Sequence, residues 1–256
     1  MLLHLHEWGD RASPPVVCLH GVSAHGRRFR RLAEERLARR FRVLAPDLRG
    51  HGRSGWEPPW TIAAHVADVL ETIAAAGVGR AAWIGHSFGG RLVLELAARE
   101  PHVVERAALL DPAIQFLPHI ALDLAEHERN DASYATAEEA IEVRLATRAR
   151  TPREFLEEEM REHLVAGADG RLRHRYCRSA VIAGYSEMCS EPPPPDTLRV
   201  PAMLVHAPEF GLVREEHLDA YASRADILAV TGGHVVYWDA YEETAYALEE
   251  FLGGID

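Results

Sequence analysis

The sequence predicts an α/β fold in which a mostly parallel sheet is covered by helices on both faces. Short apolar segments bounded by turn residues alternate with segments whose apolar residues recur every three or four positions. Such alternation needs helical crossovers, which lie on both faces of a parallel sheet. The length of 256 residues is sufficient for one domain of this kind.

Each expected element follows from its local pattern. The expected strands are apolar segments of strand length, at 14–21, 41–47, 81–87, 106–112, 202–207 and 226–230. The expected helices have a recurring apolar face, at 29–37, 62–73, 92–97, 213–222 and 239–252.

The alternation is interrupted after Pro112. Strand-like segments are then absent, and stretches rich in Glu, Arg and Ala take their place, with Thr136 and Thr151 at positions typical of helix N-caps. A stiff proline-rich segment at 191–196 leads back to the alternating pattern. The sequence therefore predicts a helical cap inserted into an α/β core. The expected boundaries are 1–112 and 196–256 for the core and 113–195 for the cap.

Composition excludes several classes of partner. The 28 Lys and Arg against 39 Asp and Glu give a formal net charge of −11, which disfavours nucleic acid and anionic lipid as partners. We expect no membrane span, and the N-terminal segment lacks the features of a secretory signal, which predicts a cytoplasmic location. Cys18, Cys177 and Cys189 form no metal or redox spacing and are expected to be reduced. The expected partner is a small-molecule substrate, bound by a monomer or a homodimer.

The segment Gly85–Gly89 carries the strongest chemical signal. Its sequence GHSFG matches the pattern G-x-S-x-G between an expected strand and an expected helix. A nucleophile on such a sharp turn has a strained backbone, and its neighbours two positions away must be glycine to avoid clashes. The helix that follows directs unpaired N–H groups at a developing oxyanion, and the N–H of Phe88 is placed to donate. We therefore predict Ser87 as a catalytic nucleophile.

These features resemble the α/β-hydrolase family, and two further motifs support the resemblance. Leu19–Val22 resembles the family's His-Gly motif, which implies that the N–H of Val22 is the second oxyanion donor. Asp47–Ser54 resembles a family loop that shapes the site without reacting, so Asp47 receives no catalytic role. The resemblance also implies the general base: Thr231-Gly232-Gly233-His234 follows the last strand, where the family places this histidine. We predict His234 as the base.

The position of the acid in the expected triad differs from the commoner family pattern. Most relatives carry an Asp after the penultimate strand, where this chain has Phe210. Asp111 is the leading candidate, because it ends a strand that opens onto the same crevice as Ser87. Glu209, one residue from the usual position, is the alternative acid. Asp239 is expected instead near the start of the last helix, where a carboxylate is favourable.

The substrate pocket and its ligands are less well specified. We expect His20 and His86 to form pocket wall or scaffold, and aromatic residues to line the pocket, with Trp56 and Trp238 foremost and Trp60, Phe116 and Tyr185 as further candidates. No cofactor and no metal are expected; His4 and His6 share a strand face, but a third ligand is not identifiable.

The predicted reaction is hydrolysis of a small carboxylic ester through an acyl-enzyme, with a lactone as a related substrate. Hydrolysis of a carbon–carbon bond by the same triad, or a weakly active receptor-like protein, are the alternatives.

Overall fold

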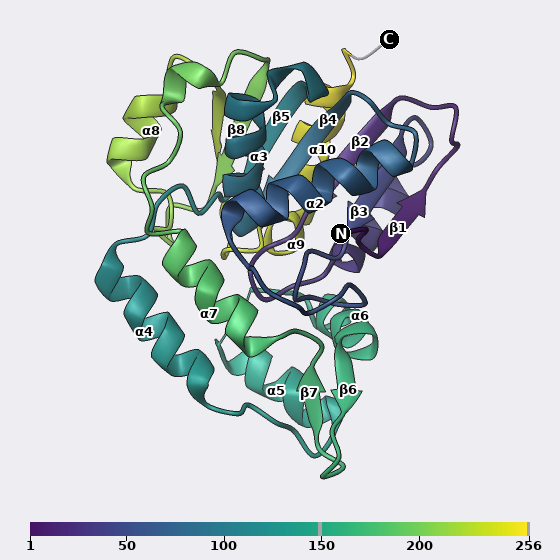
Figure 1. Cartoon of the computed structure of the whole chain (residues 1–256), viewed down its shortest axis with the longest axis vertical. Coiled ribbons are helices and arrows are strands. Elements are labelled where there is room, and N and C mark those ends of the chain that lie inside the picture. The colour runs from purple at the N-terminus through teal and green to yellow at the C-terminus, as the bar shows by residue number, and fades with distance from the viewer. Residues whose placement is uncertain (148–149, 255–256) are drawn as a thin grey trace.

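The computed structural model describes residues 1–147 and 150–254 and confirms the α/β fold. Within these residues seven strands form one sheet in the order β1-β3-β2-β4-β5-β8-β9 (Figure 1). All neighbouring strands are parallel except β1, which pairs with β3 in the antiparallel sense. The strands are β1 (Leu5–Trp8), β2 (Pro15–Leu19), β3 (Arg42–Pro46), β4 (Ala81–His86), β5 (Val104–Leu110), β8 (Ala202–His206) and β9 (Asp226–Ala229).

Helices cover both faces of the sheet, as the alternating pattern predicts. In Figure 1, α2 and α3 lie in front of the sheet and α10 lies behind it. The core helices are α1 (Arg30–Leu32), which continues into a π-helical turn at Ala33–Leu37, α2 (Ile62–Ala75), α3 (Phe88–Arg99), α8 (Glu215–Tyr221), α9 (Val236–Asp239) and α10 (Tyr241–Leu252).

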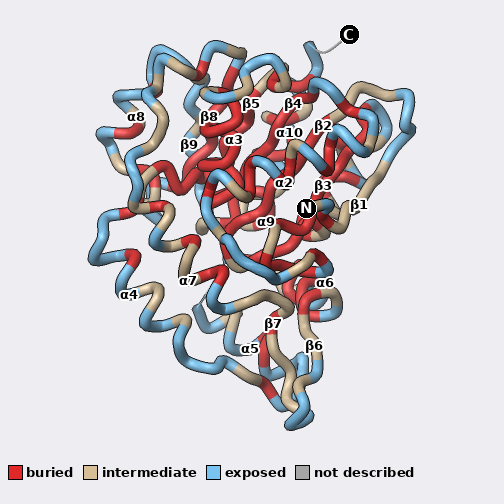
Figure 2. Tube along the Cα trace, viewed as in Figure 1, coloured by how far each residue is buried: buried red, intermediate tan, exposed pale blue. Residues whose placement is uncertain are grey.

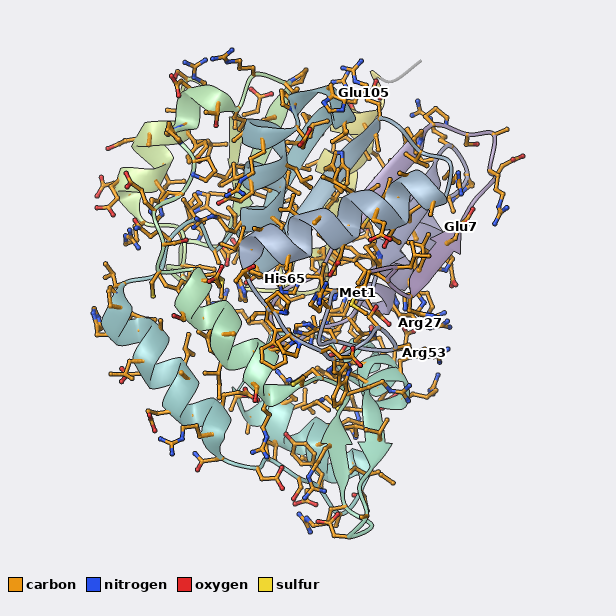
Figure 3. All side chains as sticks on the ribbon, viewed as in Figure 1. Met1, Glu7, Arg27, Arg53, His65 and Glu105 are labelled. Atoms are coloured by element: carbon orange, nitrogen blue, oxygen red, sulfur yellow. The ribbon has the colours of Figure 1, made fainter. Side chains whose placement is uncertain are left out.

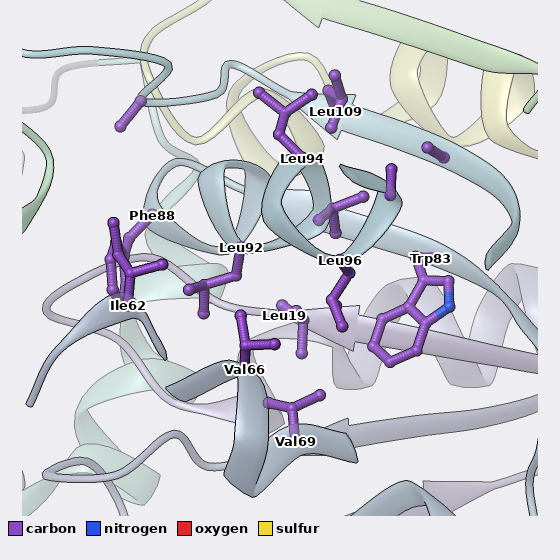
Figure 4. Close-up of a cluster of buried hydrophobic side chains, with 14 of the residues drawn as sticks. Leu19, Ile62, Val66, Val69, Trp83, Phe88, Leu92, Leu94, Leu96 and Leu109 are labelled. Atoms are coloured by element: carbon purple, nitrogen blue, oxygen red, sulfur yellow. The ribbon is translucent and has the colours of Figure 1, made fainter. Parts of the chain in front are cut away.

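Two hydrophobic clusters form the core because successive strand residues point to opposite faces. In β2, Val17 and Leu19 belong to the cluster under α2 and α3, whereas Val16 and Cys18 belong to the cluster on the other face. Figure 4 shows the first cluster, in which Leu92 and Leu96 of α3 pack towards β2. Burial is greatest along the central strands and α3 (Figure 2), whereas the edge strands β1 and β9 are partly buried or exposed. The helix α3, which follows Ser87, is therefore packed closely against the sheet.

The helices and strands between β5 and β8 form one group below the sheet in Figure 1. It is not purely helical, because residues 164–174 form a short antiparallel hairpin, so the prediction of an all-helical insertion is wrong there. Each hairpin strand has three residues, too few to give a recognisable alternation, and the turn uses Gly170 at φ +75°. The elements are α4 (Pro118–Arg129), α5 (Ala137–Thr147), α6 (Arg153–His163), β6 (Leu164–Ala166), β7 (Leu172–His174) and α7 (Arg178–Glu187).

The two expected N-caps in this segment have different outcomes. The hydroxyl of Thr136 accepts a hydrogen bond from the N–H of Glu139 at 3.1 Å, which confirms the cap of α5. The hydroxyl of Thr151 instead donates to the carboxylate of Asp239, and α6 begins after Pro152. Pro152 itself is the N-cap residue and makes no side-chain cap bond, so Thr151 lies one position before the cap and is available for a tertiary contact.

Arg91 of α3 forms hydrogen bonds with both ends of this inserted segment. Its guanidinium is 1% exposed and donates to the carbonyl of Ile114 at 2.8 Å, where the chain leaves the sheet. It also donates to the carbonyls of Ser190 at 3.1 Å and Glu191 at 2.9 Å, where the chain returns. Because α3 also follows Ser87, one helix positions both Ser87 and the inserted segment.

A buried ion pair holds α6 against the core. The guanidinium of Arg28 binds the carboxylate of Glu159 with Nε 3.0 Å from each oxygen, and both side chains are almost fully buried. We expect Glu159→Gln to lower the free energy of unfolding by about 3 kcal/mol, because it leaves the Arg28 charge buried without its counter-ion.

Urea unfolding measures this loss, and the neighbouring residue provides the control. Glu158 pairs with Arg30 at 2.8 Å and with Arg31 at 3.1 Å in a more exposed position. Glu158→Gln should therefore lower the free energy of unfolding by less than about 1 kcal/mol. Equal effects of the two substitutions would contradict a stabilising role for the buried pair.

Figure 3 draws the side chains on the ribbon and labels charged residues at both ends of the sheet. Arg53 lies on the side of the inserted segment, and Glu105, next to the start of β5, lies at the opposite end of the sheet. The carboxyl ends of the parallel strands therefore face the inserted segment. All three cysteines are free, as expected. Among the described residues, no helix has the length and hydropathy required to cross a bilayer.

Candidate active site

Ser87 lies on a sharp turn between β4 and α3, and its backbone is strained. Its φ of 53° and ψ of −116° are unusual for a residue with a side chain. Backbone hydrogen bonds fix the turn from both sides. The N–H of Ser87 donates to the carbonyl of Leu110 at 3.1 Å, and the carbonyl of Ser87 accepts the backbone N–H groups of Arg91 and Ala113. Ser87 is 5% exposed, so the strained turn presents its side chain to a confined space rather than to bulk solvent.

The glycines of the GHSFG segment are required by close backbone approach. A Cβ at Gly85 would lie 2.4 Å from the carbonyl oxygen of Gly89, and a Cβ at Gly89 would lie 2.1 Å from that of Leu19. Neither separation is possible for a real side chain, because the obstructing atoms belong to the backbone. The steric reason for glycine at both positions is therefore present in the structure.

Asp111 and His234 are joined by a short hydrogen bond. Nδ1 of His234 lies 2.6 Å from Oδ2 of Asp111, although 123 residues separate them in the chain. Asp111 has 0% exposure and a positive φ of 40°, and Ala207 donates its N–H to Oδ1 at 3.3 Å. The Asp111 N–H donates to the carbonyl of Val205 at 2.7 Å, which fixes the end of β5 beside β8. This pairing leaves Nε2 of His234 as the nitrogen able to exchange a proton with a reactant.

Phe210 occupies the position where relatives usually carry the acid, and its side chain makes an aromatic contact. The ring of Phe210 stacks on the imidazole of His234, with centroids 4.8 Å apart and planes 13° apart. Glu209, the alternative acid, forms an ion pair with Arg150. The geometry therefore joins His234 to Asp111 and directs Glu209 elsewhere.

The expected oxyanion donors lie beside Ser87. Phe88 is the first residue of α3, so its N–H has no carbonyl partner within the helix. A Cβ at Gly21 would lie 3.2 Å from Cβ of Ser87, which shows how closely the segment ending at Val22 approaches the serine. Nε2 of His51 lies 2.5 Å from the carbonyl oxygen of Val22 and fixes this segment.

A cavity of about 480 Å³ reaches both Ser87 and His234. This volume is in the range of small-molecule sites. His86 lines it as expected; its Nε2 lies 2.9 Å from the carbonyl oxygen of His234, to which it can donate. Phe116 and Tyr185 also line it.

Three expected pocket residues lie outside the cavity: the prediction is wrong for Trp56 and Trp238, whereas His20 takes the scaffold role that was its alternative. His20 is fully buried, where Nδ1 donates to the carbonyl of Gly21 at 2.8 Å and Nε2 accepts the N–H of Leu48. Trp56 lines a different hollow beside β6 and β7. Trp238 packs under the guanidinium of Arg28, 4.9 Å from the ring centroid. Aromatic composition alone does not distinguish a packed ring from a cavity wall.

The inserted segment contributes cavity residues that the sequence did not identify. Leu117, the N-cap residue of α4, and Ile120 and Leu124 within α4 line the cavity. Arg214, in the loop before α8, also lines it. The spacing of three and four residues in α4 is the signal that could have predicted an apolar face. Arg214 belongs to no motif, so the sequence offers no comparable signal for it.

One group of side chains has potential metal-ligand atoms within 4.8 Å of one another: His4, His6 and Asp47. Asp47 is the third potential ligand that could not be identified from the sequence. Nε2 of His6 lies 3.1 Å from Oδ1 of Asp47. The same carboxylate accepts the N–H groups of Gly26 at 2.7 Å and Arg53 at 2.8 Å. Asp47 therefore organises the loops of the core, in keeping with its non-catalytic assignment.

A family model described as the alpha/beta hydrolase fold matches residues 14–151, which is more than half of the chain. The chain belongs to the α/β-hydrolase fold family. The matched residues include Ser87 and Asp111, whereas His234 lies beyond them.

Known proteins agree with this membership over the whole chain. Lipase LipV of Mycobacterium tuberculosis is 33% identical, covering 98% of this chain and 98% of that protein. The structure of E-2-(acetamidomethylene)succinate hydrolase superposes with a TM-score of 0.86 at 22% identity, covering 98% of this chain and 95% of the other. The enol-lactonase of Burkholderia xenovorans LB400 superposes with a TM-score of 0.79 at 19% identity, covering 98% and 96%. Family and relatives together indicate a hydrolase.

The Asp111–His234 pair gives a prediction for pH dependence. Burial raises the pKa of Asp111 to about 7, against the lowering effects of the Ala207 N–H and of His206. The folded state therefore favours the protonated acid, and this group's contribution to the free energy of unfolding falls as the pH rises from 3.8 to about 7. Catalysis needs the ionised form, because only a carboxylate stabilises the imidazolium.

We therefore expect kcat/KM to rise with pH, with an apparent pKa near 7 that belongs to the Asp111–His234 pair. Steady-state rates between about pH 5 and about pH 9 measure this profile. A profile that is flat across neutrality would contradict the assignment of a buried, partly protonated acid.

Proposed function

We propose that the protein is a serine hydrolase that cleaves small carboxylic esters, lactones among them, through an acyl-enzyme intermediate. The observation that carries the proposal is the 2.6 Å contact between His234 and Asp111, in a site whose cavity also reaches the strained Ser87. A base oriented by a buried carboxylate and a serine on a strained turn are the parts that nucleophilic acyl transfer needs.

In the proposed first step, Oγ of Ser87 attacks the carbonyl carbon of the ester while Nε2 of His234 accepts the hydroxyl proton. The carbonyl π electrons move to oxygen, and the resulting oxyanion accepts hydrogen bonds from the N–H groups of Val22 and Phe88. Asp111 stabilises the imidazolium at Nδ1. When the tetrahedral intermediate collapses, the ester C–O bond breaks and His234 gives its proton to the leaving oxygen.

In the second step, water replaces the alcohol. His234 removes a proton from the water molecule, whose oxygen attacks the acyl carbon on Ser87. Collapse breaks the bond to Oγ, and His234 returns the proton to Ser87. The net reaction consumes one ester and one water and releases an acid and an alcohol. Every proton passes through His234, which explains why its orientation by Asp111 is central to the proposal.

The test is a panel of p-nitrophenyl esters with acyl chains of increasing length, assayed beside simple lactones. We expect turnover of short and medium chains, because the cavity beside Ser87 is of small-molecule size. Binding of the esters without release of p-nitrophenol would favour the receptor-like alternative and contradict the proposal.

A further inference from the structure

Three histidines from distant parts of the chain stack on one another where the inserted segment meets the core. His25 lies in the loop after β2, His163 is the last residue of α6, and His174 is the last residue of β7. The rings of His25 and His163 have centroids 4.5 Å apart and planes 14° apart. The ring of His174 follows, 5.1 Å from that of His163. We call these three side chains the histidine stack.

The histidine stack is removed from solvent. His163 has 0% exposure, and His25 and His174 are also buried. Neither ring nitrogen of His163 or of His174 has a hydrogen-bond partner among the described residues. A protonated imidazole is charged and carries two N–H donors, so burying it without acceptors costs more free energy than burying the neutral ring. The two rings therefore pack here most favourably as neutral imidazoles.

Neighbouring positive charges act in the same sense as burial. Burial lowers the pKa of His163 well below its usual range and that of His174 to about 3. His25 adds most to the lowering at His163, and Arg144 of α5 adds most to the lowering at His174. Arg28 of the core lowers the pKa of both rings. A proton added to the stack is therefore repelled from the core side and from the inserted segment.

Glu159 of α6 acts in the opposite sense on both rings, but its carboxylate is already engaged. It binds Arg28, and Nε2 of His25 lies 3.2 Å from its Oε2. Burial raises the pKa of Glu159, but Arg28 and His25 hold it well below its usual range. Arg31 and Arg30 likewise lower the pKa of Glu158 against the effect of burial. Both carboxylates therefore stay ionised at about pH 5, where a free histidine is protonated.

Tyrosines and a further carboxyl group also face the stack. The ring of Tyr176 stacks on that of His174 at 6.0 Å, and the ring of Tyr134 lies edge-on to it at 5.7 Å. Burial raises the pKa of Glu128, which interacts with Tyr176, so acid favours this pair. Glu128 and Tyr176 both belong to the inserted segment. Separating that segment from the core therefore does not part them.

We propose that the histidine stack is an acid-sensitive contact, which holds α6 and the β6–β7 hairpin against the core at neutral pH and releases them in acid. His174 of the hairpin borders a hollow of about 750 Å³ that also reaches His234. Release of the hairpin therefore widens access to the site from this side. The contact depends on packing and charge alone, whatever reaction the site performs.

The sign and size of the effect follow from proton binding. A released histidine titrates near pH 6.5, whereas the stacked rings of His163 and His174 stay neutral well below that pH. The docked arrangement is therefore fully favoured above about pH 6.5 and loses its advantage over the released one as the pH falls further. At about pH 5 each of these two imidazoles shifts the equilibrium about 30-fold towards release, and both together shift it about 10³-fold.

Hydrogen exchange followed by mass spectrometry measures this equilibrium peptide by peptide. Protection factors are compared, because they remove the effect of pH on the intrinsic exchange rate. In the wild-type protein, the protection factors of α6 and of the hairpin should fall about 10³-fold between about pH 7.5 and about pH 5. The central elements β4 and α3 should keep larger protection factors than α6 at about pH 5, because the core stays folded.

Replacing the histidines should remove the pH dependence in steps. His163→Phe keeps a flat ring that cannot be protonated, so the fall in α6 should shrink to about 30-fold, and it should be lost in His163→Phe/His174→Phe. His65→Phe is the matched control. His65 of α2 is also buried and burial lowers its pKa to about 3, but it packs against Phe88 within the core. The fall in α6 should stay at about 10³-fold in this control.

A wild-type α6 that keeps its protection factors at about pH 5 would overturn the proposal, and so would a fall of wild-type size in the folded double variant. Equal protection factors in α6 and β4 at about pH 5 would show that the whole protein unfolds, which also contradicts a local release. The wild-type comparison needs no substitution, so a variant that fails to fold does not remove the test. Labelling of Ser87 at neutral pH is independent of all these outcomes.

Discussion

Asp111→Asn should lower kcat by about 10⁴, the size of loss seen when the acid of a serine protease triad is replaced by its amide. Oδ2 of Asp111 lies 2.6 Å from Nδ1 of His234, and the acid has no exposure to solvent. An amide at this place can donate to Nδ1, which favours the wrong tautomer and leaves Nε2 unable to accept the proton of Ser87. The lost negative charge also leaves the imidazolium without its counter-ion.

Glu209→Gln is the control for this experiment. Glu209 is the alternative candidate for the acid and lies in the loop where most relatives carry it. Its carboxylate, however, pairs with Arg150. We expect its kcat to remain within about twofold of wild type, since an exposed pair contributes little. Circular dichroism and thermal unfolding of both variants separate lost catalysis from lost structure. A near-normal rate for folded Asp111→Asn would contradict the assignment of the acid.

Ser87→Ala should lower kcat by about 10⁶, because the proposed covalent route is removed completely. Alanine lacks the hydroxyl oxygen, whereas the donors at Val22 and Phe88 stay in place. Residual activity would therefore come from binding and from oxyanion stabilisation alone.

Adding His234→Ala to this variant tests whether the two residues act as a unit. The double variant should be about as slow as Ser87→Ala, because the effects of residues acting in one step are not additive. Single-turnover rates with a p-nitrophenyl ester measure both variants. A further large loss in the double variant would show that His234 acts on a different path, such as direct activation of water.

The strained turn at Ser87 was predictable from the sequence because its causes are local. Gly85, Ser87 and Gly89 lie within five residues, and the strand before and helix after them have clear patterns. The backbone clashes that a Cβ would cause at both glycines are the structural form of the same constraint. Local chemistry and local geometry therefore agree at this site.

The sequence reduced the candidates for the acid to Asp111 and Glu209 but could not decide between them. Asp111 follows β5 and His234 follows β9, and they are brought together by the pairing of both strands with β8, a long-range register that no local pattern encodes. The sequence showed that position 210 is not an acid. It could not show that Phe210 stacks on His234 and that Glu209 pairs with Arg150.

The inserted segment was the least predictable part of the chain. Its hairpin is too short for periodicity to reveal, and its contribution to the cavity depends on how α4 and α7 pack against each other. His174 belongs to that hairpin, and nothing in its local sequence distinguishes it from the other histidines. Trp56 and Trp238 were named for their chemistry, but tertiary packing decides which rings reach a cavity.

Labelling with a fluorophosphonate tests the central claim most directly, because the reagent reacts with an activated serine and needs no knowledge of the substrate. Peptide mass spectrometry of the labelled protein should locate one phosphonyl adduct on Ser87, and labelling should be lost in Ser87→Ala and strongly slowed in Asp111→Asn. A wild-type protein that is folded and stays unlabelled, or that carries its label on another residue, would contradict the assignment of Ser87 as the nucleophile.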